Sequence, residues 1–305
     1  MDDVISRRSM LRGAALSAAA LLVSGRLDAS ALLGGAAPET DRERLARWLR
    51  TLRADGLARE HGALGPAVAR AGELALGTPY RAHTLEAYLA GGGAPANEPL
   101  TLHLDGFDCV TLVESAVAVA RAARIGADPG WADFAREVER MRYRGGIRAG
   151  YASRLHYFSE WILDGARRGL VRDMGRELGG EADRRPLRFM TEHRSAYAAL
   201  KDDATFAAIG DMERSLDDAP RWVIPTAKIP QATARIRTGD VLAFATSIDG
   251  LDASHTGMAY RDRAGVLRVL HAPLSGGEVE VSRSTLHGYV SAIRRATGVM
   301  VARPV

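Results

Sequence analysis

The sequence has 305 residues, of which 47% are apolar and 26% are charged, the composition of an ordinary soluble globular protein. Lysine and arginine together number 41 against 37 acidic residues, which gives a formal net charge of +4. No basic stripe with interleaved aromatic residues occurs, so the composition argues against a nucleic-acid-binding protein. The excess of positive charge suits contact with an anionic cell wall or membrane surface.

The first 31 residues have the pattern of an export signal. A twin arginine, Arg7-Arg8, precedes an apolar run of about eleven residues from Gly13 to Val23, and small residues follow it. Such a run is too short to span a bilayer. We therefore expect residues 1–31 to form a twin-arginine (Tat-type) signal, which is an address and not a membrane anchor, and the protein to be periplasmic or otherwise exported. The alternative is an amphipathic or buried first helix.

Residues 32–305 are expected to form one domain. Apolar residues at helical spacing predict several helices in its first part, followed by a mostly helical insert at about residues 131–216. The expected helices cover residues 41–53, 64–76, 84–89 and 110–124.

Toward the C-terminus the apolar residues change to a spacing of two, which is typical of strands. Helices followed by a series of strands argue for an α+β domain with segregated layers, and a parallel βαβ architecture is not supported. The expected strands cover residues 100–104, 241–246, 255–261, 267–272, 278–281 and 298–302.

Cys109 is the only cysteine. Exported proteins usually pair their cysteines, and a single one cannot pair within its chain, so it is either a small buried side chain or a functional thiol. Asp108 occupies the N-cap position of a predicted helix that begins at Cys109. A thiol in the first turn feels the positive end of the helix dipole, which favours the thiolate. The N–H groups of that turn can also hold an oxyanion.

Two histidines follow on neighbouring predicted strands, His255 and His271. Between them lies the turn sequence from Asp262 to Gly265, in which Gly265 suits the left-handed position of a three-residue loop. With residues 263–265 as the loop, both rings lie on one sheet face along a diagonal of about 7–8 Å. A two-residue loop would place them on opposite faces. The first arrangement offers a base, His255, oriented by His271, although either histidine alone would more often be structural.

These residues lie in longer stretches that form a recognisable pattern. The stretches are Phe107–Glu114, Met141–Arg144, Gly150–Tyr157 with Trp161, Phe189–His193 with Tyr197, Gly239–Leu242, Gly250–Gly257 and Leu270–Ala272. By this pattern the sequence, from about residue 70 onward, resembles the N-acetylmuramoyl-L-alanine amidase-like family of the NlpC-type superfamily of papain-like cysteine hydrolases. It departs from the family pattern at Pro273, where a small serine is frequent, and at Met258, where an aliphatic residue is common.

The resemblance implies a papain-like fold in which the nucleophile helix packs on a small antiparallel sheet. It implies hydrolysis of the amide between N-acetylmuramic acid and L-alanine in peptidoglycan fragments, anhydro-muropeptides included. By the family pattern Cys109 attacks the carbonyl, His255 relays the proton and His271 orients His255. No cofactor is implied, and the partners are muropeptides, without nucleic acid or a stable membrane anchor.

Tyr151, Ser153, Arg154 and His156 are candidate substrate-binding residues. Arg154, with Ser153 and His156 nearby, could bind the carboxylates or sugar oxygens of a muropeptide. Equally, Arg154 and His156 could form ion pairs within the insert. A zinc amidase is disfavoured, because no His-Glu-x-x-His motif or cysteine cluster exists and the remaining histidines lack metal-ligand spacing: His61, His83, His103 and His287.

Three alternative functions remain open on the residues alone. The first is an endopeptidase that cuts a stem-peptide bond, such as the one between γ-D-glutamate and the diamino acid. The second is an acyltransferase that uses the same cysteine and histidine with an amine acceptor, since the fate of the acyl intermediate depends on the shape of the cleft. The third is a non-catalytic cell-wall-binding protein whose thiol is unused.

Overall fold

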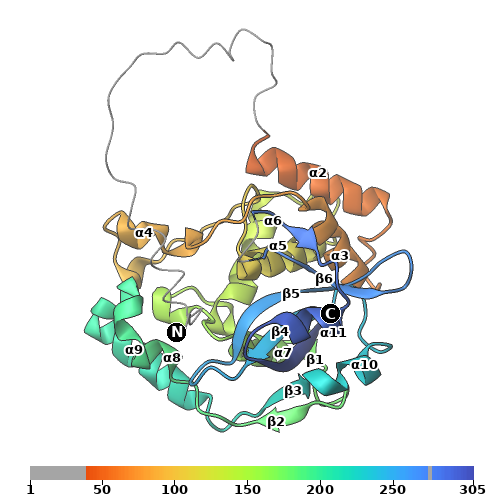
Figure 1. Cartoon of the computed structure of the whole chain (residues 1–305). Helices are drawn as coiled ribbons and strands as arrows, with labels where there is room; N and C mark the ends of the chain where they lie inside the picture. The colour runs from red at the N-terminus through yellow and green to blue at the C-terminus, as the bar shows by residue number, and fades with distance from the viewer. Residues whose placement is uncertain (1–38, 274–276) are drawn as a thin grey trace, which may run out of the picture.

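The computed structural model describes residues 39–273 and 277–305 (Figure 1). The predicted export signal at residues 1–31 lies outside the described residues. The α-helices are α2 (Asp41–Ala54), α3 (Gly65–Leu74), α4 (Ala87–Ala90), α5 (Cys109–Ala122), α6 (Trp131–Arg142), α7 (Phe158–Arg167), α8 (Phe189–Glu192), α9 (Asp203–Ser215), α10 (Ile229–Ala232) and α11 (Leu286–Ala292).

The strands form one sheet in the order β2-β3-β8-β4-β5-β6-β7, and β1 also pairs with β8. Every pairing between these strands is antiparallel, so the predicted α+β class with an antiparallel sheet is confirmed. The strands are β1 (Val171–Asp173), β2 (Glu181–Asp183), β3 (Arg221–Pro225), β4 (Val241–Thr246), β5 (Ala253–Arg261), β6 (Leu267–His271), β7 (Glu280–Val281) and β8 (Ala296–Pro304).

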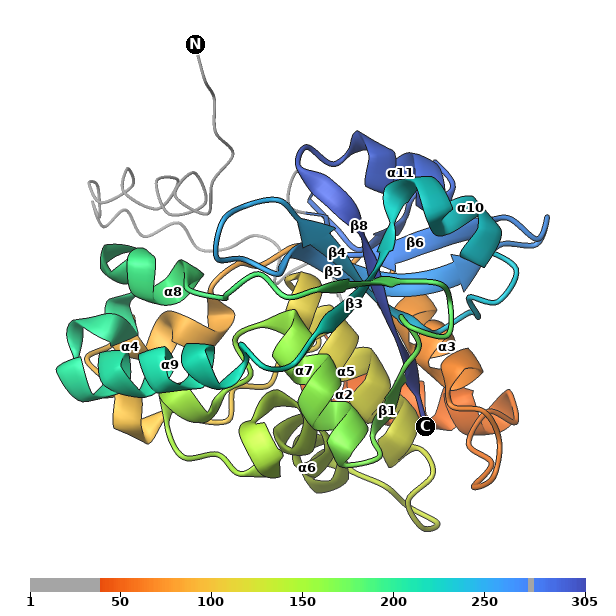
Figure 2. The same ribbon diagram turned by 90° about the horizontal axis from the view of Figure 1, so that it is seen from below.

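Helices cover both faces of this sheet. Figure 2 shows α10 and α11 on one side of the strands and α5 and α7 on the other. All six residues of β4 are buried, because Val241 and Ala243 face the core beneath α5 while Leu242 and Phe244 face the core beneath α10 and α11. A strand that is covered on both faces reads as a continuous apolar run, as residues 241–246 do.

The helix that begins at Cys109 is the central helix of the fold. Between Thr111 and Ala122 every residue of α5 except Arg121 is buried. The helix contacts α2, α3 and α6 as well as β5. A helix that is apolar all round has to be enclosed on all sides, which is the position that α5 occupies.

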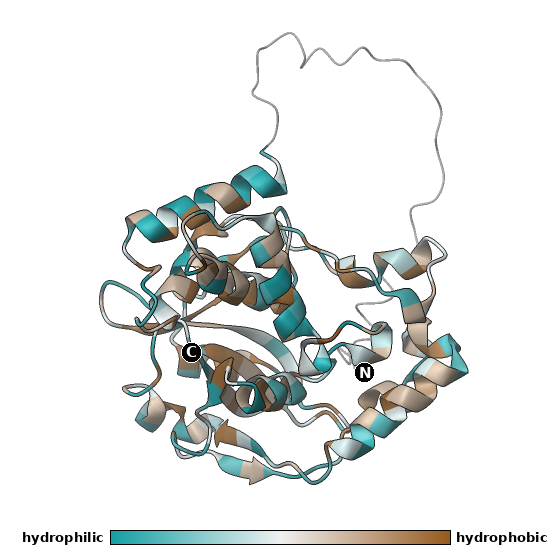
Figure 3. Cartoon of the chain, turned by 180° about the vertical axis from the view of Figure 1, so that it is seen from behind, coloured by the Kyte–Doolittle hydropathy of each residue, from teal (hydrophilic) through white to brown (hydrophobic). Residues whose placement is uncertain are grey.

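The N-terminal helix α2 is by contrast amphipathic. It buries one stripe of residues, Leu45, Trp48, Leu49 and Leu52, and exposes charged side chains between them. Figure 3 shows this helix with hydrophilic and hydrophobic segments alternating along its length. Its N-cap, Thr40, forms a capping box with Glu43, which satisfies two backbone N–H groups of the first turn.

The hairpin of β5 and β6 has the loop length that the sequence predicts. Arg261 pairs with Leu267, and the N–H of Asp262 donates to the carbonyl of Val266 at 3.0 Å, so the loop consists of residues 263–265. Gly265 has a φ of 81°, the left-handed conformation expected for it. This loop fixes which side chains of the two strands share a face.

The prediction of a strand at Leu100–Leu104 is wrong. The leucines of this segment do face the core, but the backbone is irregular because side chains satisfy its polar groups. The N–H of Leu104 donates to Asp41 at 3.0 Å, and its carbonyl accepts from Arg44 at 3.0 Å. The leucines of this segment therefore face the core at every second position although no neighbouring strand among the described residues pairs with it.

The insert expected at residues 131–216 contains α6 to α9 and, in addition, the short strands β1 and β2. Each of these strands has three residues, which is too short for a period of two to be read from sequence. A separate core joins α8 and α9 to the segment around Tyr151 and Tyr157. Within the described part of the chain, no helix is both long enough and apolar enough to cross a membrane.

The loop of the β5–β6 hairpin can be tested at Gly265. Changing Gly265→Val should lower the free energy of unfolding by about 1–3 kcal/mol, because a β-branched residue is strained at positive φ. The control Gly265→Asn should cost less, since asparagine tolerates the left-handed region. Urea denaturation of both variants measures the difference, and equal losses would contradict the assigned loop conformation.

Candidate active site

Cys109 is the first residue of α5, directly after its N-cap. The carboxylate of Asp108 accepts a hydrogen bond from the N–H of Thr111 at 2.7 Å, and the Thr111 hydroxyl accepts from the N–H of Asp108 at 2.9 Å. This reciprocal cap confirms the predicted helix start. Cys109 is half-buried, so the first turn of an otherwise enclosed helix reaches the surface. A half-buried thiol at a helix N-terminus has the position that a nucleophile needs.

His255 and His271 form a hydrogen-bonded pair. The Nε2 atom of His255 lies 3.0 Å from Nδ1 of His271, and both side chains are buried. The predicted placement of the two rings on one sheet face is therefore confirmed. Gly257 makes room for them, because a Cβ there would lie 3.0 Å from the Cβ of His271. The remaining ring nitrogen of His255, Nδ1, is buried and has no hydrogen-bond partner among the described residues.

Burial keeps both imidazoles neutral. Removal from water lowers the pKa of His255 to about 3, and the charge that His271 would carry lowers it as well. Burial likewise lowers the pKa of His271 to about 4. At neutral pH each ring thus has one N–H and one bare nitrogen, and a neutral imidazole with a bare nitrogen can act as a proton acceptor.

Tyr289 on α11 contacts the histidine pair and is affected by the charge of Cys109. Its hydroxyl lies 3.2 Å from Nδ1 of His271. Burial raises the pKa of Tyr289, and the negative charge of the Cys109 thiolate raises it further. The same charge adds to the effect of burial on the pKa of Tyr80, which precedes the Cys109 helix in the chain. The charge of the thiolate therefore acts on the same tyrosine that contacts the histidine pair.

Sequence reasoning missed Tyr289. The residue lies 18 positions after His271 on a helix of seven residues that was not predicted. A signal for that helix exists, because Thr285 is a typical N-cap and Leu286 and Val290 have the spacing of one helical face.

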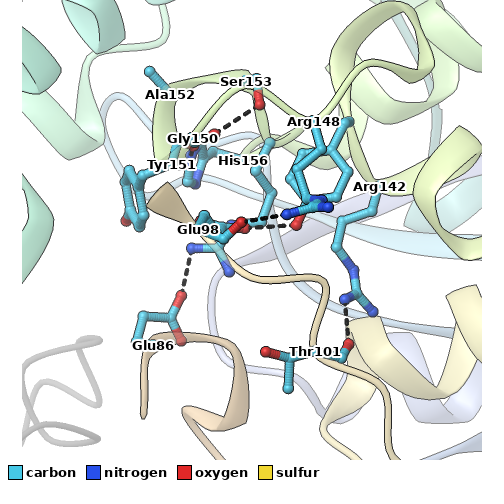
Figure 4. A network of polar contacts seen from close by, with 12 residues as sticks. Glu86, Glu98, Thr101, Arg142, Arg148, Gly150, Tyr151, Ala152, Ser153 and His156 are labelled. Carbon is cyan, nitrogen blue, oxygen red and sulfur yellow. Dashed lines mark hydrogen bonds and ion pairs between the residues drawn. The ribbon is translucent and has the colours of Figure 1, made fainter. Parts of the chain in front are cut away.

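The four candidate substrate-binding residues lie in a polar network at the edge of the insert. Figure 4 shows Tyr151, Ser153 and His156 gathered with Glu86 and Glu98. The hydroxyl of Ser153 donates to the carbonyl of Gly150 at 2.6 Å. The Nε2 atom of His156 lies 2.8 Å from the carbonyl oxygen of Tyr151, and the two rings are 4.5 Å apart.

Arg154 is buried within this network, with 7% of its side chain exposed. It donates to Glu86 at 2.6 Å and lies 3.7 Å from Glu98, and its guanidinium stands 4.8 Å from the ring of Tyr151. Burial disfavours the cation, but the charges of the two glutamates more than offset this and raise the pKa of Arg154. These contacts match the structural alternative for Arg154, while a contact with substrate stays a prediction.

The network borders the start of the Cys109 helix. Burial raises the pKa of Asp108, although the hydrogen bonds from Thr111 lower it in part. The negative charge of Glu86 also raises this pKa. On the next turn Glu114 forms a buried ion pair with Arg142 at 2.7 Å. Arg142 also donates to the carbonyl of Thr101 at 2.6 Å, which ties α6 and the segment before Cys109 to α5.

One group of side chains could approach a metal ion. Ligand atoms of Asp41, His103 and Asp105 lie within 4.8 Å of one another. A search of the sequence for metal-ligand spacing could not detect this group, since Asp41 lies far from His103 and Asp105 in sequence. However, Asp105 forms an ion pair with Arg81 at 2.8 Å and Asp41 accepts the N–H of Leu104. Each contact uses one oxygen of its carboxylate, and Oδ1 of Asp105 has no hydrogen-bond partner among the described residues. Partly exposed acidic groups are common without an ion, so we assign no metal to this group.

A pocket of about 210 Å³ lies between α7 and β3. Ile162, Leu163 and Trp222 contribute to its walls, together with Asp173 and Arg221. None of the predicted catalytic or substrate-binding residues lines it. The pocket is therefore separate from the histidine pair.

Comparison with known proteins identifies the family. Residues 70–299 match the AmiA-like family, described as N-acetylmuramoyl-L-alanine amidase-like. The chain belongs to this amidase-like family. Membership in this family indicates that the protein is, in general terms, a peptidoglycan amidase-like hydrolase. A comparison with curated protein sequences finds no match.

Several solved structures resemble this chain, and one of them is described as an amidase. A structure of an N-acetylmuramoyl-L-alanine amidase from Bacteroides uniformis is 31% identical, covers 79% of this chain and 99% of its own, and superposes with a TM-score of 0.72. A Bacteroides fragilis protein described as a candidate xylanase is 34% identical over 76% of this chain and 99% of its own, with a TM-score of 0.69. Protein LPG0564 from Legionella pneumophila, at 18% identity and a TM-score of 0.62 over 87% of this chain and 94% of its own, shares the fold.

The neutral histidine pair should make the amidase-like protein sensitive to acid. Unfolded histidines take up protons below pH about 6.5. The buried rings resist protonation down to pH about 4 for His271 and about 3 for His255. Between pH about 6.5 and these lower values, the unfolded state binds more protons than the folded state. The free energy of unfolding therefore falls as the pH falls.

We expect His271→Asn to reduce the loss of stability between pH 7 and 4.5 by on the order of 2 kcal/mol relative to the unmodified protein. His287, which is exposed on α11, supplies the control. Its replacement by asparagine should leave the pH dependence unchanged. Urea denaturation at both pH values gives the comparison, and an unaltered pH dependence in His271→Asn would count against the neutral buried ring.

The buried position of Arg154 predicts a stability cost. Replacing Arg154→Met should lower the free energy of unfolding by on the order of 3 kcal/mol, because the buried carboxylate of Glu98 loses a cation. The control Arg136→Met removes an ion pair with Asp133 whose arginine side chain is 58% exposed, and should cost less than about 1 kcal/mol. Similar losses for both variants, measured by thermal and urea denaturation, would contradict this role.

Proposed function

We propose that this protein is a cysteine amidase with a papain-like, NlpC-type core that hydrolyses the amide joining N-acetylmuramic acid to L-alanine in peptidoglycan fragments, anhydro-muropeptides included. The observations that carry the proposal are the buried, hydrogen-bonded pair of His255 and His271 and the half-buried Cys109 at the capped start of α5. The amidase-like family supports the scissile bond.

The proposed reaction begins with transfer of the Cys109 thiol proton to the bare Nδ1 of His255. The sulfur attacks the lactyl carbonyl carbon of the muramoyl group, and backbone N–H groups of the first turn of α5 stabilise the oxyanion. The His255 imidazolium then protonates the amine of L-alanine as the C–N bond breaks. Water then attacks the resulting thioester while His255 accepts a proton from the water. The C–S bond breaks, and His255 returns the proton to the sulfur, which restores the thiol and releases the free acid.

We further propose that Tyr151, Ser153, Arg154 and His156 form one wall of the substrate cleft. Support comes from the charge of Glu86, the ion-pair partner of Arg154, which affects the Asp108 cap beside Cys109. Because Arg154 is enclosed, it would act by holding the wall in shape and by presenting the carboxylate of Glu86, whose side chain is 37% exposed.

The location and the domain organisation complete the proposal. We propose that residues 1–31 direct export by the twin-arginine route, so that the enzyme meets its muropeptide substrates in the periplasm or beyond. Residues 32–305 then form a single amidase domain with its insert at about 131–216. No cofactor is required by this chemistry, since Cys109 and His255 supply the nucleophile and the proton transfers.

Digestion of purified muropeptides with mass-spectrometric analysis tests the function. The amidase should release a free peptide that begins with L-alanine and a sugar without peptide. Cys109→Ala should reduce turnover by at least about 10³-fold, because the nucleophile is removed. The control Cys109→Ser keeps nearly the same shape, so that a loss of folding can be told from a loss of the thiol.

Other products would contradict cleavage of the muramoyl–alanine amide. Peptides cut within the stem would indicate an endopeptidase, and transfer to an added amine in preference to water would indicate an acyltransferase. Binding of muropeptides without any turnover, or full activity in Cys109→Ala, would exclude the cysteine amidase.

A further inference from the structure

Tyr289 approaches the histidine pair from outside the sheet. It lies on α11, which packs against β6 and β8. Its ring centroid is 4.8 Å from that of His271 at an interplanar angle of 69°, and 5.3 Å from that of Phe244. Phe244 in turn stacks on His255 at 5.6 Å. The two aromatic residues therefore enclose the pair and fix the direction of the Tyr289 hydroxyl.

Two neighbours meet at one nitrogen of His271. Its Nδ1 atom lies 3.0 Å from Nε2 of His255 and 3.2 Å from the hydroxyl of Tyr289. If Nδ1 carried a hydrogen, it could donate to only one of them at full strength. If Nδ1 is bare, both the His255 N–H and the tyrosine O–H can donate to it. The convergence of two donors favours the bare nitrogen.

The opposite nitrogen of His271 points to the same assignment. Nε2 is buried without a hydrogen-bond partner among the described residues, and the nearest carboxylate oxygen, of Glu280, is 3.8 Å away. A carboxylate accepts hydrogen bonds and does not donate them, so it attracts an N–H at this position. The Glu280 side chain is 55% exposed, which weakens this attraction and leaves the main influence to Tyr289.

We infer that Tyr289 is a positioning residue, which donates its hydroxyl hydrogen to Nδ1 of His271 and thereby selects the tautomer pair in which His255 can act as a base. With Nδ1 of His271 bare, His255 carries its hydrogen on Nε2 and its Nδ1 is bare. In the opposite arrangement His271 donates to Nε2 of His255, whose hydrogen then sits on Nδ1. The inference rests on the proposed function, since it assigns Nδ1 of His255 as the acceptor of the thiol proton.

The proton balance shows why the tautomer matters. The S–H bond of Cys109 breaks and an N–H bond forms at Nδ1 of His255, which leaves a thiolate and an imidazolium that keeps its Nε2 hydrogen. That hydrogen remains donated to His271, so the pair is undisturbed by the transfer. With the opposite tautomer, Nδ1 of His255 already carries a hydrogen and the transfer cannot occur. Tyr289 itself neither gains nor loses a proton.

Nitrogen-15 NMR of histidine-labelled, full-length protein tests the assignment, because protonated and bare ring nitrogens resonate in different ranges. In the unmodified protein Nδ1 of both rings should be bare and Nε2 of both should carry hydrogen. In Tyr289→Phe both tautomer pairs should be populated, so that the Nδ1 and Nε2 signals of the two rings move toward intermediate positions. The control Tyr260→Phe removes a hydroxyl that donates to Glu73 at 2.8 Å and should leave both signals unchanged.

Muropeptide kinetics supply the second readout. Tyr289→Phe should lower kcat by about tenfold and change KM by less than about twofold, because the ring is kept and the population of the active tautomer falls. Tyr260→Phe should retain both constants. Unchanged nitrogen signals in Tyr289→Phe would overturn the inference whether kcat falls or not, since the tyrosine would then act only through packing.

The two proposals can fail separately. The nitrogen signals need no substrate and should persist in Cys109→Ala. Full turnover in that variant would refute the cysteine amidase and, with it, the role of the tautomer in catalysis. Loss of turnover in Cys109→Ala together with unchanged nitrogen signals in Tyr289→Phe would retain the amidase and refute only the role of Tyr289.

Discussion

The enclosure of α5 is the constraint on which the rest of the structure depends. Helices α2, α3 and α6 and strand β5 all pack against it, so the helix cannot shift without opening several contacts at once. The buried pair of Glu114 and Arg142 adds a polar contact whose loss would leave a buried charge. Apart from Arg121 near its end, the helix emerges from this enclosure at its first turn. A rigid core thus holds Cys109, although the residue itself lies at the surface of the core.

The parts of the site that could be predicted are those fixed by local sequence. The cap of α5 depends on Asp108 and Thr111, three residues apart, and the register of β5 and β6 depends on a three-residue loop. Both can be read from a few neighbouring residues. The α+β class was equally accessible, because long apolar runs distinguish helices from the strands that follow them.

The parts that could not be predicted depend on distant partners. Tyr289 reaches His271 only because a short helix folds back over the sheet, and no local pattern says which side chain that helix presents. Leu100–Leu104 alternates like a strand, yet its backbone groups bind side chains from α2 and α6. The environment of Arg154 likewise depends on Glu86 and Glu98, more than fifty residues earlier, so sequence left its structural and substrate-binding roles equally open.

The position of β8 has a consequence for how the chain acquires its structure during synthesis. This strand, which follows all the others in sequence, lies between β3 and β4, and β1 also joins the sheet through it. The strands of the insert and the hairpin of the two histidines therefore become one sheet only when residues 296–304 have left the ribosome. Until then both halves expose unpaired edges, which are prone to aggregation. A chain that ends before Ala296 would lose the strand that joins them, so we expect nascent or truncated chains to depend on chaperones and to be removed by proteases.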